Sequence, residues 1–62
     1  MSDIEALVLR HEKPIYRLAL RLTQDESAAL CMTVRVFTEA LRCLPPSDIT
    51  LPRLYALALA LQ

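Results

Sequence analysis

Residues 51–62 have the sequence LPRLYALALALQ, which carries no charge from Leu54 to Leu61. Leu and Ala alternate almost strictly in it, which is typical of a half-buried strand. Ala and Leu are nevertheless strong helix formers, the run has no β-branched residue, and Pro52 suits the first turn of a helix. We therefore expect a helix with two apolar sides. Its core side holds Leu54, Leu57, Ala58 and Leu61, and its second side holds Tyr55 and Leu59.

The loop PPSDIT, residues 45–50, separates this helix from a longer one. Its two prolines end the longer helix, and Thr50 can cap the last helix. The longer helix should run from about Glu26 to Leu44, and its start is capped either by Thr23 with Glu26 or by Asp25 alone. At 100° per residue, its core side holds Leu30, Val34, Phe37, Leu41 and Leu44. A neighbouring side holds Met32, Val36 and Cys43, so either two elements or a second chain must pack on this helix.

The first 25 residues predict another helix. Ser2 and Glu5 form a capping box that starts it at about Asp3. An apolar stripe follows at helical spacing: Ile4, Leu7, Val8, His11, Ile15, Leu18, Ala19 and Leu22. Because Pro14 lacks a backbone donor and clashes with the preceding turn, we expect a kink or break near residues 11–13. The predicted fold is all-α: one domain over residues 1–62, a bundle of three helices, or four if Pro14 breaks the first.

Length and composition limit the function classes. A chain of 62 residues suits one small domain, which usually needs an efficient core, a staple or a partner. Seven basic residues balance seven acidic ones, so the chain has no overall electrostatic attraction to nucleic acid or membrane. No apolar run approaches the ~20 residues that span a bilayer, and the start lacks the order of a signal peptide. We therefore expect a cytoplasmic protein that does not bind membranes.

No catalytic constellation stands out in the sequence. Cys31 and Cys43 lie in one predicted helix about 18 Å apart, too far for a mutual disulfide, so reduced thiols are expected. We expect His11 at the core or its boundary rather than as a ligand, and Asp25 with Glu26 as a helix cap rather than a carboxylate pair. No nucleophile–base pair, phosphate loop or metal-ligand spacing occurs. Neither an enzyme nor a cofactor is predicted.

Three stretches resemble a known family. They are LVLRHEKPIYRLALRLTQD at residues 7–25, VFTEALRCLP at residues 36–45 and LPRLYALALA at residues 51–60. Their order is similar to that in region 2 of bacterial RNA polymerase sigma factors, in the small extracytoplasmic-function group. The resemblance covers nearly the whole chain and is most specific over residues 7–25. It implies a helical domain that docks on the clamp helices of the polymerase's large subunit and helps to open the −10 promoter element.

The chain departs from this family at the polymerase-docking surface. The family has an acidic, glutamine-bearing run just before its Val-Phe pair, and here the aligned positions are Cys31, Val34 and Arg35. A thiol, a branched alkyl group and a positive charge thus replace Asp, Gln and Glu. If the partner surface is basic, Arg35 would repel it. The charge-assisted contact of the family's acid is then lost, and the charge at this position has the opposite sign.

The last helix departs at the DNA-facing surface. After its Leu-Tyr pair the family usually shows basic and polar residues, whereas this chain has Ala56, Leu59 and Ala60. Phosphate contacts need Lys or Arg, and Arg53 is the only basic residue from Leu44 onward. We therefore expect DNA binding to be weak or absent. If the chain is complete, it also lacks the second sigma domain that reads the −35 element.

These patterns predict a degenerate sigma-region-2-like domain in bacterial transcription, in initiation or its regulation, acting through protein–protein contacts. The expected partner is a second copy in a homodimer, core RNA polymerase or a sigma regulator. The candidate partner interface is Met32, Val36, Cys43, Tyr55 and Leu59, of which the first three are expected to be buried either within the chain or across an interface. A basic side of the first helix is either solvated or a face for nucleic acid or an acidic partner: Arg10, Lys13, Arg17 and Arg21.

Two alternatives remain open. The chain could be a fragment of a genuine sigma factor that still binds core polymerase and −10 DNA. It could also be a small helical oligomerisation module unrelated to transcription.

Overall fold

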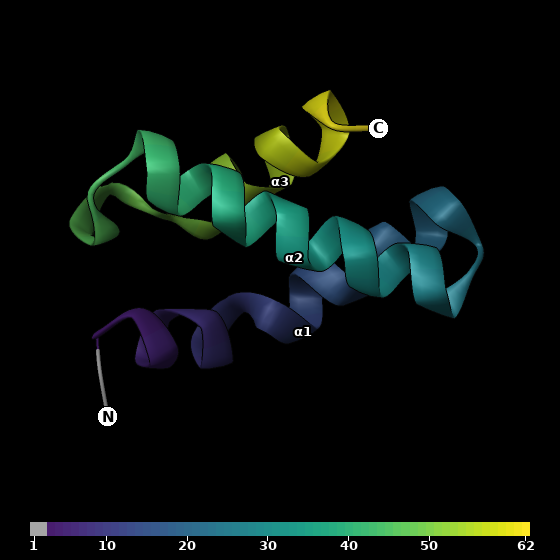
Figure 1. The fold of residues 1–62 in the computed structure, drawn as a ribbon, viewed down its shortest axis with the longest axis horizontal. Coiled ribbons are helices and arrows are strands. Elements are labelled where there is room, and N and C mark those ends of the chain that lie inside the picture. Colours follow the sequence, from purple (N-terminus) through teal and green to yellow (C-terminus); the bar gives the residue numbers. More distant parts are fainter. Residues whose placement is uncertain (1–2) are drawn as a thin grey trace.

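Three α-helices account for most of the chain in the computed structural model, which describes residues 3–62. They are α1 (Asp3–Thr23), α2 (Glu26–Cys43) and α3 (Leu51–Ala60), with a 3₁₀ turn, η1 (Pro46–Asp48), before α3. Residues 3–62 contain no strand, so the predicted all-α class is confirmed. Figure 1 shows α2 lying between α1 and α3, with neighbouring helices running in opposite directions. Two helices of the same chain, α1 and α3, therefore pack on α2, which is one of the two explanations expected for its wide apolar arc.

The helix α1 runs through Pro14 without a break. Of the kink or break expected near residues 11–13, the break is therefore wrong, and the bundle has three main helices rather than four. Proline removes one backbone hydrogen bond, but Ile15 and Ala19 just after it are completely buried. Packing of this buried face holds the helix together across the proline, because tertiary contacts supply most helical stability. The helix begins at Asp3 as predicted, while the expected cap Ser2 lies outside the described residues.

The turn from α1 to α2 consists of Gln24 and Asp25. Gln24 has a φ of 56°, and its amide donates to the carbonyl of Leu20 at 2.7 Å. This left-handed residue ends α1 and satisfies one of its last carbonyls. The turn is short, so α1 and α2 fold back side by side (Figure 1).

Asp25 alone caps α2. Its Oδ2 atom accepts a hydrogen bond of 2.8 Å from the backbone amide of Ala28. The hydroxyl of Thr23 instead donates to the carbonyl of Ala19 at 2.8 Å, so the Thr23 alternative is not adopted. An acidic residue at this position also complements the helix dipole.

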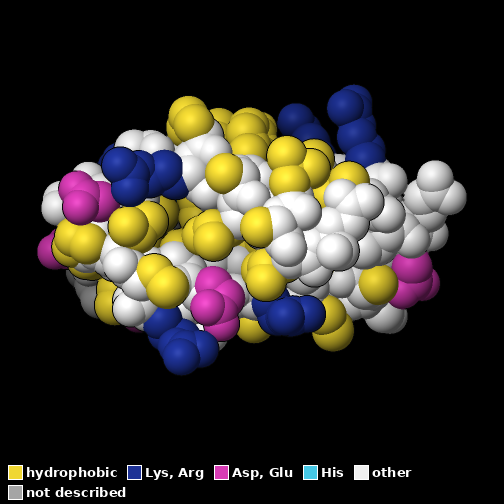
Figure 2. Space-filling view, turned by 90° about the horizontal axis from the view of Figure 1, so that it is seen from above, with side chains coloured by type: hydrophobic (Ala, Val, Ile, Leu, Met, Phe, Trp, Pro, Cys, Tyr) yellow, Lys and Arg dark blue, Asp and Glu magenta, His cyan; other side chains and the backbone are white. Residues whose placement is uncertain are grey.

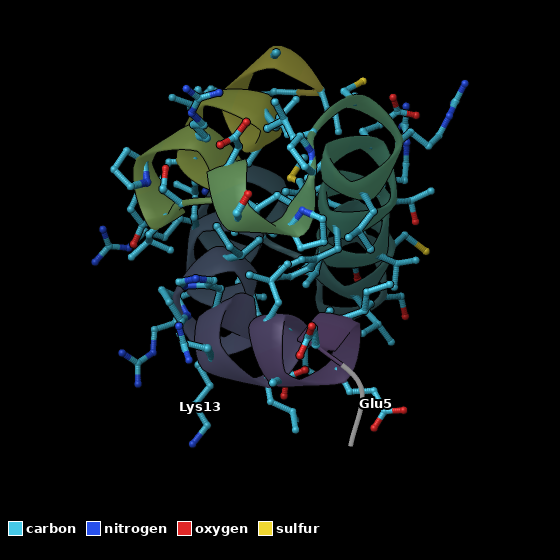
Figure 3. All side chains as sticks on the ribbon, turned by 90° about the vertical axis from the view of Figure 1, so that its left-hand side faces the viewer. Glu5 and Lys13 are labelled. Atoms are coloured by element: carbon cyan, nitrogen blue, oxygen red, sulfur yellow. The ribbon has the colours of Figure 1, made fainter. Side chains whose placement is uncertain are left out.

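The core lies where the three helices meet. Its largest completely buried side chains are Ile15, Val36 and Leu54, one from each helix. Figure 3 looks along the bundle, and side chains from the helices converge in the space between them. Ile49, which follows η1, also enters this core and is 5% exposed.

The inward side of α2 agrees in part with the expected one, because Phe37 is buried and Leu41 and Leu44 pack against the core. Leu30 and Val34 are 59% and 57% exposed, although they were assigned to the core side. The buried positions of α2 are instead Ala29, Thr33, Val36, Phe37 and Ala40. This buried side includes two alanines as well as the large Phe37, and it turns Leu30 and Val34 outward. The buried hydroxyl of Thr33 is satisfied by the carbonyl of Ala29 at 2.8 Å.

The last helix has the predicted core side. Leu54 and Ala58 are buried, and Leu57 and Leu61 are half-buried against the core. Thr50 occupies the N-cap position, but its side chain makes no capping hydrogen bond, so that part of the expectation is wrong. None of the helices within residues 3–62 combines the length and apolar character needed to cross a bilayer.

Candidate functional site

A groove of about 450 Å³ lies between α1 and α3 at the surface of the bundle. Helix α3 contributes Tyr55 and Leu59, which are one turn apart and therefore lie on the same side. The α1 wall holds residues at helical spacing, namely Pro14, Arg17, Leu18 and Arg21. The groove thus brings together two sets of residues that were predicted separately, half of the basic side of α1 and the second apolar side of α3.

The α1 wall of this α1/α3 groove is cationic. Arg17 and Arg21 are exposed and lie four positions apart, a spacing that makes them neighbours on a helix surface. Among residues 3–62, no acidic side chain lines the groove. The ion pair of Arg42 with Glu39, at 3.1 Å, lies on α2 and involves neither groove arginine.

The other two basic residues of α1 lie outside the groove. Arg10 and Lys13 are exposed but do not line it. In Figure 3, Lys13 points away from the bundle on one flank of α1, while Glu5 projects from the other flank. The four cations are therefore not one uniform surface. Arg17 and Arg21 line the α1/α3 groove, whereas Lys13 lines a second hollow with Glu12, Tyr16 and Leu30, which Arg17 also borders.

The α3 wall of the groove is apolar and partly rigid. Tyr55 is half-buried and packs against the core, whereas Leu59 is 56% exposed. Figure 2 views the molecule from the α3 side and shows hydrophobic side chains spread over the middle of that face, with Lys and Arg toward its edges. Tyr55 is fixed by the core and Leu59 is exposed beside it. Contact with an apolar side chain of a partner would remove this apolar surface from water, which is favourable.

The five residues of the predicted partner interface do not form one surface. Val36 is completely buried in the core between α2 and its neighbours, so it cannot reach a partner. Met32 is half-buried against the core, and Cys43 is exposed rather than buried because it is the last residue of α2. Cys43 ends α2 at the end of the bundle opposite the C-terminal end of α3 (Figure 1). Only Tyr55 and Leu59 of this set lie together.

The three positions aligned with the polymerase-docking run share the outer face of α2. Cys31, Val34 and Arg35 are all exposed, and the thiol of Cys31 is free. Leu30 stands beside them and is 59% exposed. This α2 outer face carries an apolar side chain, a thiol and a cation at the places where the family has acids and an amide.

Two groove residues were not expected in a site. The sequence predicts a helix interruption at Pro14 and a core position for Leu18, yet both residues line the groove. The signal was present, because they recur with Arg17 and Arg21 at spacings of three and four. Within residues 3–62, no group of three His, Cys, Asp or Glu side chains is placed to hold a metal ion.

Comparison with protein-family models, with curated proteins and with solved structures finds no match to this chain. Its function is therefore argued from its own residues.

Proposed function

We propose that this chain is a sigma-region-2-like helical domain of bacterial transcription, working in the cytoplasm through contacts with another protein. The observation that carries the proposal is the α2 outer face. Cys31, Val34 and Arg35 are exposed together at the positions where the resembled family docks on polymerase. These three positions are exposed, but none of them carries an acid. The domain would therefore have kept the helical framework and changed its partner or its affinity.

The outer side of α3 supports contact with protein rather than with promoter DNA. Ala56, Leu59 and Ala60 are exposed and uncharged, and Arg53 is the one charged side chain of this helix. DNA binding depends on Lys and Arg contacts to phosphate, which this surface does not supply. An exposed apolar surface instead favours a protein partner.

The test restores the family's residues on the α2 outer face. The variant Cys31→Asp/Val34→Gln/Arg35→Glu is compared with the native chain for binding to immobilised core RNA polymerase. We expect weak or undetectable binding of the native chain and a gain of at least about thirtyfold for the variant, because one lost charge contact costs ~2 kcal/mol or more. All three positions are exposed, so the substitutions should leave the fold intact, which circular dichroism checks.

A matched control changes the net charge by the same amount elsewhere. Arg53→Glu with Gln62→Glu also makes the chain more negative by three charges, at two exposed positions of the C-terminal part. This control should not gain polymerase binding. If the restored variant gains no more than the control, the relationship to sigma region 2 is rejected.

A second measurement addresses promoter DNA. A fluorescent single-stranded −10 oligonucleotide is titrated with the native chain at about 150 mM salt, beside a scrambled oligonucleotide. We expect no preference for the −10 sequence. Tight, sequence-dependent binding would instead favour a genuine sigma fragment and overturn the proposal of protein contacts.

A further inference from the structure

We propose that the α1/α3 groove binds an acidic amphipathic helix from a partner protein, one that presents two carboxylates and an apolar side chain. The inference specifies the partner chemistry of the protein-binding domain proposed above and rests on it to that extent. It uses a different surface, however. The polymerase test alters the α2 outer face, so the two ideas can fail separately.

The charge of the groove requires an acidic occupant. Arg17 and Arg21 line it, no acidic side chain of residues 3–62 lines it, and neither arginine takes part in the Arg42–Glu39 ion pair. Guanidinium groups bind carboxylates with paired hydrogen bonds, so two arginines one turn apart match two carboxylates one turn apart. A segment with Asp or Glu at positions i and i+4 of a helix has this spacing.

The opposite wall requires an apolar anchor on the same segment. Tyr55 and Leu59 face the groove, with Leu18 contributed by α1. The volume of about 450 Å³ lies in the range of small binding sites, ~300–1,000 Å³. A helix laid in such a groove can insert a leucine or aromatic side chain beside Tyr55 while its acids face α1.

A nucleic-acid strand fits the groove less well. Its phosphates repeat along the strand and need a continuous row of cations. Of the four basic residues of α1, Arg17 and Arg21 line the groove, while Arg10 and Lys13 lie outside it. The chain also has seven basic and seven acidic residues, so no general positive field extends the site.

The experiment selects binders without assuming a partner. A displayed library of helical peptides of about 16 residues, a length that permits several turns, is selected against the native chain. We expect the enriched peptides to carry Asp or Glu four positions apart, with Leu, Ile or an aromatic one turn from them. The most enriched peptide is then synthesised and its Kd measured by fluorescence anisotropy.

Variants locate the binding site. Arg17→Glu/Arg21→Glu should weaken the synthesised peptide at least about tenfold, because charge complementarity is reversed. Leu59→Ser should also weaken it severalfold. The matched control Arg42→Glu/Arg53→Glu makes the same change in net charge at exposed positions outside the groove and should leave the Kd within twofold, an effect of about 0.4 kcal/mol. Backbone amide shifts in NMR should change at residues 17, 21, 55 and 59.

Several results would overturn the proposal. They are a library that yields no binder, enriched peptides without acids, and shift changes that fall on the α2 outer face. Binding of a single-stranded oligonucleotide in the groove at about 150 mM salt would assign it to nucleic acid instead. A dimer in sedimentation that Arg17→Glu/Arg21→Glu converts to monomer would assign the groove to a second copy.

Discussion

Leu54 and Leu59 lie five positions apart on α3, yet Leu54 is completely buried while Leu59 is 56% exposed. One leucine of α3 therefore belongs to the core, and the other lies at the surface. Leu54→Ala should lower the free energy of unfolding by about 2–5 kcal/mol, because it leaves a cavity among all three helices. That loss is large against the ~3–9 kcal/mol expected for a domain of this size. Urea unfolding followed by circular dichroism measures it.

The matched control is Leu59→Ala on the same helix. It should change the free energy of unfolding by no more than about 0.5 kcal/mol, because its side chain is mostly in water. Equal losses for the two variants would mean that α3 does not pack through Leu54 as the structure has it.

Asp25 provides a second prediction, at the start of α2. Asp25→Ala removes the acceptor of the Ala28 amide and should lower the free energy of unfolding by about 1 kcal/mol. Thr50→Ala is the control, since Thr50 holds the same position at the start of α3 without a capping hydrogen bond. We expect an effect at Thr50 that is clearly smaller. Thermal unfolding of the two variants beside the native chain makes the comparison, and a larger loss at Thr50 would contradict it.

The helices could be predicted from the sequence because their signals are local. Apolar residues recur at helical spacing in α1, Asp25 can cap α2, and Pro52 suits the first turn of α3. The helix formers of residues 51–62 outweighed the strand-like alternation, and the structure has a helix there. The expected break at Pro14 failed for a reason that is not local, because the buried residues after the proline stabilise the helix across it.

Which side of α2 faces the core, and which residues line the α1/α3 groove, depend on how the helices pack. Helical periodicity alone does not determine this packing. A wide apolar arc could turn either Leu30 and Val34 or Ala29 and Ala40 inward. In the structure Ala29 and Ala40 face inward together with Val36 and Phe37, while Leu30 and Val34 face outward. Ile49 was missed for a similar reason, because it lies in a loop and is buried only once the turn at η1 folds over the core. Arg17 and Tyr55 were singled out separately, and only the packing of α1 against α3 joins them.

Gln24 should tolerate replacement by glycine with a gain in stability. Its φ of 56° is left-handed, a region that costs most side chains about 1 kcal/mol and glycine little. The chain has no glycine, so the left-handed conformation of this turn is adopted by a residue with a side chain. Gln24→Gly should raise the free energy of unfolding by about 0.5–1 kcal/mol. The control Gln62→Gly, at the exposed C-terminus, should have no effect in the same thermal unfolding measurement. A loss of stability at Gln24 would contradict the left-handed turn.

The two cysteines should both react without unfolding. Cys31 and Cys43 are free and exposed. A thiol reagent added to the native chain should therefore titrate both, and Cys31→Ser or Cys43→Ser should each leave a single reactive thiol. This is a direct test of Cys43, whose pattern in the sequence predicts burial. A thiol that reacts only after denaturant is added would show that the end of α2 is covered.

Pro14→Ala should stabilise the chain. Proline inside α1 removes one backbone donor and strains the preceding turn, which costs up to about 3 kcal/mol relative to alanine. Two effects reduce the gain, because proline also restricts the unfolded chain and its half-buried ring lines the groove. We expect a net rise of about 1–2 kcal/mol in the free energy of unfolding, together with increased helical circular dichroism.

The neighbouring Lys13→Ala is the control for this substitution. Lys13 is exposed and points away from the bundle, so its removal should change stability by no more than about 0.5 kcal/mol (Figure 3). If Pro14→Ala were instead destabilising, the ring of Pro14 would contribute more to packing between α1 and α3 than the helix loses at the proline. Contact of the Pro14 ring with α3 would then stabilise α1 more than the buried Ile15 and Ala19 do.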